Sequence, residues 1–154
     1  MLTPGETIPD VTLEGADGKP VRVRDLPGER ALVLYFYPKD ETAGCTAEAC
    51  SFRDHYQDFT DAGADVVGVS ADGQDAHARF IDRHRLPFKL LTDKGGAAAA
   101  AFGVKKSFLG LVPGRVTFVI DRAGKVRHAF DSQIRATAHV GEALRVVREI
   151  QQKS

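Results

Sequence analysis

The sequence predicts an α/β protein, a three-layer α/β/α sandwich with an N-terminal β-hairpin extension. A continuous apolar and aromatic run, ALVLYFY at 31–37, is typical of a strand that is covered on both faces. A helical pattern and a second buried run, DVVGVSA at 65–71, follow it, and this order predicts a right-handed parallel crossover. Two more strand patterns, at 115–121 and 125–131, precede a closing amphipathic helix.

The N-terminal segment TIPDVTLEGADGKPVRVRDL alternates between apolar and polar residues. This alternation predicts a short hairpin with strands at 11–13 and 21–23, joined through the turn residues Asp17 and Gly18. We expect the hairpin to extend a larger sheet.

The run at 31–37 is the expected central strand, and Pro38 ends it. Residues 46–56 suit a helix, and Gly63 separates that helix from the second buried strand at 65–71.

A second helix is predicted at 75–84, with an inner face formed by Ala76, Phe80 and Ile81 and an outer face formed by Arg79, Asp82 and Arg83. LPFKLLTD at 86–93 supplies a short strand. The five alanines that follow predict a short helix closed by Gly103 rather than a functional tract.

After an irregular segment at 105–114, the strands at 115–121 and 125–131 are separated by the turn 122–124, which predicts an antiparallel pair. The last helix, HVGEALRVVREIQ, has one apolar face, formed by Val140, Leu144, Val147 and Ile150. We find no internal repeat and no linker. The order of elements therefore describes a thioredoxin-like fold in a single domain over residues 1–154.

Composition excludes several functions. The chain has 154 residues with 21 acidic and 21 basic side chains, so no bulk positive field is present to hold nucleic acid or an anionic membrane. The start has no basic region followed by an apolar run, and about 18 consecutive apolar residues occur nowhere. We expect a soluble, cytoplasmic protein.

In a reducing compartment, a close cysteine pair either cycles between thiol and disulfide or stays reduced.

Both cysteines, Cys45 and Cys50, lie in YFYPKDETAGCTAEACSFRDHY at 35–56. If a helix runs onward from Cys45, five residues of rise separate the two along the axis by roughly 7.5 Å, beyond the ~7 Å limit between the Cα atoms of a disulfide. A disulfide between them would require the helix to open. We expect the first turn to be held by few long-range contacts and to open at a cost of about a few kcal/mol.

Cys45 is a candidate nucleophile, because it follows the carboxyl end of the central strand and stands at the start of a helix. Unpaired backbone N–H groups and the helix dipole there stabilise a thiolate. The alternative is an inert, small apolar residue. Cys50, inside the helix, suits a buried core thiol as well as a functional one.

A metal site and a disulfide oxidoreductase of the C-x-x-C type are both disfavoured. The C-x-x-C motif is absent, and the five histidines are scattered without ligand spacing, so we assign each to the surface or the core. They are His55, His77, His84, His128 and His139.

The segment PKDETAGCTAEACSFRD resembles the active-site segment of the peroxiredoxins, in particular the Q-type branch, also called bacterioferritin comigratory protein. The resemblance extends over VVGVSAD, LPFKLLTDKGGAAAAAFGV, 115–121 and 139–144. Pro38, Thr42 and Cys45 match the family pattern P-x-x-x-T-x-x-C, and Arg115 matches the family's distant arginine. One departure is Ala43, where this branch usually has proline, which predicts a more mobile loop before Cys45.

The resemblance implies a thiol peroxidase that uses no cofactor. Cys45 would attack hydrogen peroxide or an alkyl hydroperoxide, with Thr42 and Arg115 holding the peroxide oxygens and Pro38 shielding the thiolate from water. It assigns Cys50 as the resolving thiol that forms an intramolecular disulfide. Thioredoxin is the implied reductant, and a monomer is the implied state.

Other expectations concern neighbouring residues and rival functions. Glu48 should cap the helix start or pair with an arginine, and the apolar residues at 108–112 could line a substrate-facing loop. A slowly oxidised redox sensor and a reductase of protein disulfides are the rival functions. Lys105 and Lys106 are solvated charges rather than a nucleic-acid site.

Overall fold

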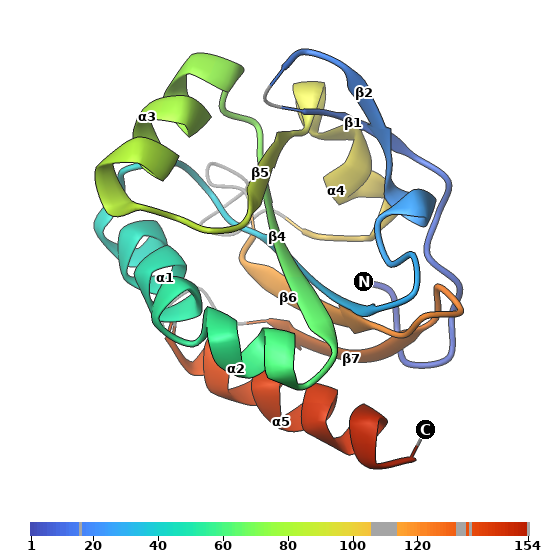
Figure 1. The fold of residues 1–154 in the computed structure, drawn as a ribbon. Coiled ribbons are helices and arrows are strands. Elements are labelled where there is room, and N and C mark those ends of the chain that lie inside the picture. The colour runs from blue at the N-terminus through green and yellow to red at the C-terminus, as the bar shows by residue number, and fades with distance from the viewer. Residues whose placement is uncertain (16, 106–113, 132–134, 136, 154) are drawn as a thin grey trace.

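The central strand of the sheet is β3 (Ala31–Phe36), whose six side chains are all buried. The computed structural model describes residues 1–15, 17–105, 114–131, 135 and 137–153. Within them, one seven-stranded sheet has the order β2-β1-β5-β4-β3-β6-β7 (Figure 1). The other strands are β1 (Thr12–Glu14), β2 (Pro20–Arg22), β4 (Ala64–Ser70), β5 (Lys89–Thr92), β6 (Val116–Ile120) and β7 (Val126–Asp131).

The strand directions confirm the predicted topology. β3 pairs in parallel with β4, and β4 in parallel with β5, so both connections are crossovers. β6 runs antiparallel to β3 and pairs with β7 as the predicted hairpin. The β1–β2 hairpin extends the sheet beyond β5, where Glu14 pairs with Thr92.

Helices cover both faces of the sheet. The helical elements are η1 (Val23–Asp25), α1 (Ala43–Asp54), α2 (Tyr56–Asp61), α3 (Gln74–His84), η2 (Lys94–Gly96), α4 (Ala97–Ala101) and α5 (Ala138–Lys153). One core contains Phe52 from α1, Phe80 from α3 and Val147 from α5. The other core lies on the opposite face and contains Phe102, which follows α4, and Ile8 from the N-terminal segment. The three-layer α/β/α class is therefore confirmed (Figure 1).

Several boundaries differ from the prediction. α1 begins at Ala43, three residues early, because Thr42 is extended (φ −77°, ψ 154°) and its carbonyl already accepts a hydrogen bond from the Thr46 N–H at 2.8 Å. The hairpin strands are shifted by about one residue, and the strand expected at 86–93 is shortened to β5. The irregular segment expected at 105–114, including the apolar residues at 108–112, lies mostly outside the described residues.

Side-chain burial confirms most of the predicted helix faces. In α5, Val140, Leu144 and Val147 belong to the core and Ile150 packs against it. In α3, Phe80 is buried and Ile81 packs against the core, but His77 is also fully buried, which the prediction did not include.

Candidate active site

Cys45 lies in the first turn of α1, just beyond the carboxyl end of β3, and only 1% of its surface is exposed. Thr42 is the N-cap residue of this helix. The free N–H groups of the first turn and the helix dipole both favour negative charge on the sulfur. The structure thus places Cys45 where a thiol can act as a nucleophile.

Arg115 directly precedes β6, the strand that pairs with β3, and contacts the sulfur of Cys45 from there. Phe36 pairs with Val116 in the antiparallel β3–β6 ladder, so Arg115 continues that register level with the end of β3. Its Nη2 donates a hydrogen bond to Cys45 Sγ at 3.3 Å, and its Nη1 donates to Glu48 Oε1 at 2.6 Å. Arg115 is 4% exposed, so it is not the surface residue that a strand pattern alone would indicate.

Gly44 leaves the space that the guanidinium occupies. A Cβ atom at this position would lie 3.1 Å from Arg115 Nη2, which is tighter than an ordinary van der Waals contact. The glycine before Cys45 therefore has a steric role, because it permits the close approach of Arg115.

Glu48 is fully buried one turn after Cys45 and forms the expected pair with an arginine. Burial raises the pKa of Glu48 to about 8, while the positive charge of Arg115 limits that rise. For Arg115, burial disfavours the charged form, but Glu48 and Cys45 outweigh it and raise the pKa of the guanidinium. The second carboxylate oxygen, Oε2, lies 3.6 Å from Nδ1 of the buried His139.

The Thr42 side chain is exposed at the mouth of this site. Its hydroxyl donates a hydrogen bond to the Lys39 carbonyl at 2.9 Å. Because the hydroxyl hydrogen points at that carbonyl, the lone pairs of Oγ1 remain available to accept a hydrogen bond from a bound molecule.

Comparison with known proteins decides the family. The model of the AhpC/TSA family matches residues 4–129. The chain belongs to this family. It is 40% identical over 149 residues to the chloroplastic peroxiredoxin Q of Triticum aestivum, covering 97% of this chain and 68% of that protein. It is 41% identical over 144 residues to the chloroplastic peroxiredoxin Q of Arabidopsis thaliana, covering 94% and 66%.

Solved structures agree with the sequence relatives. Peroxidoxin BcpB from Mycobacterium tuberculosis superposes with a TM-score of 0.89 at 39% identity, covering 97% of this chain and 99% of that chain. Peroxiredoxin Q from Xanthomonas campestris superposes with a TM-score of 0.85 at 29% identity, covering 96% and 98%. The chain is thus a thioredoxin-fold peroxiredoxin of the Q type, and its activity is that of a thiol peroxidase.

Both cysteines of this peroxiredoxin are free thiols in the structure. Cys50 lies on the intact helix α1, five residues beyond Cys45, so the two side chains are rotated by about 140° around the helix axis. Cys45 accordingly faces the core, whereas Cys50 is half-buried. The geometry confirms that α1 must open before the sulfurs can meet.

The first turns of α1 are held more firmly than the sequence indicated. Arg115 contacts both Cys45 and Glu48, and Ala49 is fully buried. Beyond Cys50, Phe52 stacks on Tyr35 with ring centroids 4.6 Å apart and closes the helix against the core. The expectation of few long-range contacts was therefore wrong, because Arg115, distant in the sequence, contacts the first two turns of the helix.

Pro38 follows Tyr37 directly and is half-buried in the loop that leads to Thr42. Pro38 and Thr42 therefore lie in the same loop, which ends where α1 begins. Its assignment as a shield of the thiolate stays a prediction.

Sequence reasoning missed a buried polar cluster beneath this loop. Tyr37, Asp40 and His77 are each at most 5% exposed and are joined by hydrogen bonds. Only part of the signal for this cluster was present in the sequence. Asp40 lies in the cysteine segment, but no local pattern links it to His77, which is 37 residues away.

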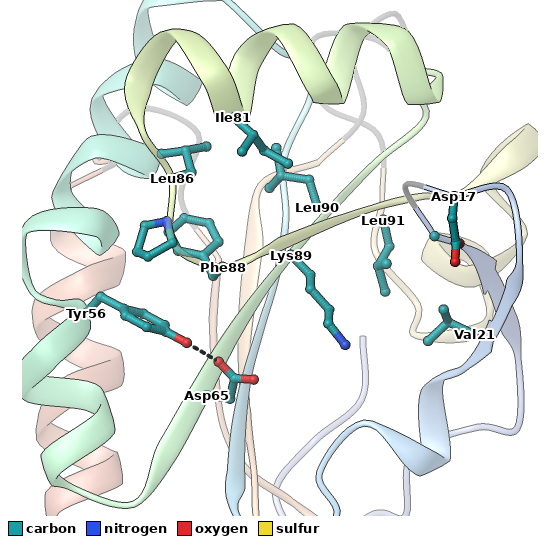
Figure 2. Close-up of a pocket in the computed structure, with 12 residues that line it drawn as sticks. Asp17, Val21, Tyr56, Asp65, Ile81, Leu86, Phe88, Lys89, Leu90 and Leu91 are labelled. Carbon is teal, nitrogen blue, oxygen red and sulfur yellow. Dashed lines mark hydrogen bonds between the residues drawn. The ribbon is translucent and has the colours of Figure 1, made fainter.

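A groove of about 560 Å³ lies apart from the cysteines, at the sheet edge between the β1–β2 hairpin and helices α2 and α3 (Figure 2). Its lining includes Tyr56, Leu86, Phe88 and Lys89, and neither Cys45 nor Arg115 is among the lining residues. The groove is therefore separate from the site around Cys45.

Two further findings concern the described residues alone. None of their helices combines the length and apolar character needed to span a bilayer. Among them, no three histidine, cysteine or acidic side chains come together as a set that could hold a metal ion.

Proposed function

We propose that Cys45 is the peroxidatic cysteine of this peroxiredoxin and that Arg115 activates it. The observation that carries the proposal is the 3.3 Å contact between Arg115 Nη2 and Cys45 Sγ in a site where both side chains are buried. Low exposure strengthens the electrostatic interaction between the guanidinium and the sulfur.

The reaction begins when the Cys45 thiolate attacks one oxygen of the peroxide. The sulfur forms a bond to that oxygen, the O–O bond breaks, and the other oxygen leaves as hydroxide or alkoxide, which takes up a proton. Cysteine is oxidised to the sulfenic acid while the peroxide is reduced to water or an alcohol. Arg115 and the helix N–H groups stabilise the charge that moves onto the leaving oxygen.

Thr42 orients the peroxide in this scheme. Its hydroxyl hydrogen is engaged by the Lys39 carbonyl, so Oγ1 accepts the hydrogen bond that a peroxide O–H donates. Pro38 lies in the same loop and limits the access of water to the Cys45 thiolate.

Cys50 resolves the sulfenic acid. Its thiolate attacks the Cys45 sulfur, the S–O bond breaks as the disulfide forms, and the sulfenic oxygen leaves as hydroxide, which takes up a proton to give water. Because α1 must open first, the oxidised protein carries a locally unfolded segment that a dithiol protein can reach. Thioredoxin is the reductant we propose.

The substrates we propose are hydrogen peroxide and alkyl hydroperoxides. The bacterioferritin comigratory protein of Xanthomonas campestris, which is 28% identical to this chain, is described as having alkyl peroxide reduction activity. We further propose that the chain acts as one domain, which the single sheet of the described residues supports. We also propose that the protein is a monomer in the cytoplasm.

A coupled assay tests the proposal. The protein is mixed with hydrogen peroxide, thioredoxin, thioredoxin reductase and NADPH, and the loss of NADPH is followed. We expect turnover in the wild type and none in Cys45→Ser, whereas Cys50→Ser should consume about one equivalent of peroxide and then stop. Unchanged turnover of Cys45→Ser would overturn the assignment of Cys45, and full cycling of Cys50→Ser would overturn that of Cys50.

A further inference from the structure

We propose that His77 is a positioning residue for the peroxidase reaction: acting through Asp40, it fixes the peptide plane to which the Thr42 hydroxyl is bound. The inference rests on the proposed function of Thr42. It is carried by a continuous set of contacts that joins helix α3 to the active-site loop.

The first contact joins the His77 ring to the Asp40 carboxyl group. His77 Nδ1 lies 2.6 Å from Asp40 Oδ2, and the Tyr37 hydroxyl donates to Asp40 Oδ1 at 2.5 Å. Both carboxyl oxygens are therefore engaged. Since Asp40 and His77 are 5% and 1% exposed, no solvent competes for these bonds.

The other ring nitrogen fixes the position of His77. His77 Nε2 lies 3.1 Å from the carbonyl oxygen of Leu91 in β5. A carbonyl can only accept, so the Nε2 nitrogen that faces it carries a hydrogen, and Nδ1 faces the Asp40 carboxyl group. The ring is thereby anchored to the sheet at one end and holds the loop at the other.

The second contact holds the backbone of Asp40. Its N–H donates to Asp72 Oδ2 at 2.8 Å, and the same carboxylate oxygen accepts from the Ser70 hydroxyl at 2.7 Å. Ser70 ends β4, so the amide of Asp40 is tied to the carboxyl edge of the sheet. Side chain and backbone of Asp40 are thus held from two different elements.

The third contact leads to the site. The N–H of Asp40 and the carbonyl of Lys39 belong to one planar peptide group. That carbonyl accepts the hydrogen bond from the Thr42 hydroxyl at 2.9 Å. Any rotation of this peptide plane therefore moves the Lys39 carbonyl oxygen that orients Thr42. The hydrogen bonds to the side chain and the N–H group of Asp40 prevent that rotation.

Glu41, which lies between Asp40 and Thr42, indicates that contacts from neighbouring elements must fix the conformation of this loop. Glu41 has a φ of 66°, in the left-handed region that non-glycine residues seldom adopt. A strained residue persists where its neighbours determine its conformation. On its outer side, the Glu41 carboxylate lies 3.1 Å from the exposed Arg83 and 3.7 Å from the half-buried His84.

A double-mutant cycle tests the inference. His77→Gln is made in the Cys50→Ser protein and again with Thr42→Val, and two rates are measured at pH 7 and 25 °C: sulfenate formation with hydrogen peroxide and alkylation of Cys45 by iodoacetamide. We expect His77→Gln to lower the peroxide rate about tenfold and to leave alkylation unchanged, because only the peroxide uses Thr42. In the Thr42→Val background, His77→Gln should have no further effect.

Matched variants separate positioning from stability. Arg83→Gln, which removes a 71% exposed partner of the same loop, should leave both rates unchanged. Should His77→Gln fail to fold, Tyr37→Phe removes one bond to Asp40, and a drop in the peroxide rate alone is again expected.

Three results would overturn the inference: an unchanged peroxide rate, an equal fall in both rates, or an undiminished effect of His77→Gln when Thr42 is absent. Failure of the proposed function would look different. In that case the parent Cys50→Ser protein itself would react with peroxide no faster than an unstructured cysteine peptide.

Discussion

Arg115 Nη2 lies 3.3 Å from the sulfur of Cys45, although 70 residues separate the two in the sequence. The same guanidinium binds Glu48, so one buried side chain connects Cys45 to the second turn of α1. The activation of the thiol that we propose and the stability of α1 would therefore depend on the same residue.

Arg115→Lys keeps a positive charge but loses the fork that bridges Cys45 and Glu48. We expect the rate constant for hydrogen peroxide to fall by about 10²–10³, because one nitrogen cannot replace two directed donors. Competition with a reference peroxidase measures it. Arg127→Lys is the control, since Arg127 forms a part-exposed pair on β7. A rate within threefold of the wild type would contradict the role of Arg115.

Gly44→Ala tests the space beside the guanidinium. The added Cβ would lie 3.1 Å from Arg115 Nη2, so the guanidinium must shift by a few tenths of an ångström, and we expect the peroxide rate to fall about tenfold. Gly141→Ala in α5 is the matched control, because its Cβ meets no atom within 4 Å. Equal rates for the two variants would show that Gly44 has no steric role.

Glu48→Gln should change how stability depends on pH. Burial holds the pKa of Glu48 at about 8, above its ordinary value of 4.5, so the folded state binds more protons than the unfolded state between these values. The free energy of unfolding contributed by Glu48 is therefore present below pH 4.5 and lost as the pH rises toward 8.

Urea unfolding at several pH values between 5 and 8 measures this effect. Glu48→Gln should reduce the fall in stability across that window, while Glu149→Gln, in an exposed pair with Arg145, should leave it unchanged. A slope equal to that of the wild type in Glu48→Gln would show that Glu48 does not titrate in this range.

Ala43→Pro should slow disulfide formation. Ala43 is the first residue of α1, where proline fits well, and the extended Thr42 suits a residue before proline. We expect the reduced protein to gain about 0.4–1 kcal/mol and the helix to open more slowly. Mass spectrometry after a peroxide pulse follows the conversion of sulfenate to disulfide. An unchanged conversion rate would mean that opening of the first turn does not limit resolution.

Local sequence patterns predicted much of the fold because they report on short-range physics. The run at 31–37 is apolar throughout, so it predicted a strand buried on both faces, and β3 is such a strand. The helix start was placed too late because Ala43 and Gly44 have no apolar periodicity; the extended Thr42 and its carbonyl decide where α1 begins.

The site was predictable only where a motif carried it. The position of Cys45 at a helix start indicated that residue, whereas Thr42 and Arg115 were assigned by resemblance, since a strand pattern cannot show which distant residue it meets. The hydrogen bond between His77 and Asp40 depends on how α3 packs against the loop that contains Asp40. No periodicity in the sequence of the helix or of the loop predicts that contact.

The most direct test of the account is the second-order rate constant of hydrogen peroxide with Cys45 in the Cys50→Ser protein, compared with a cysteine in an unstructured peptide. Because Arg115 and the helix start stabilise the charge that develops on the peroxide, we expect the protein thiol to react about a hundredfold faster or more at the same pH. Equal rates for protein and peptide would contradict the account.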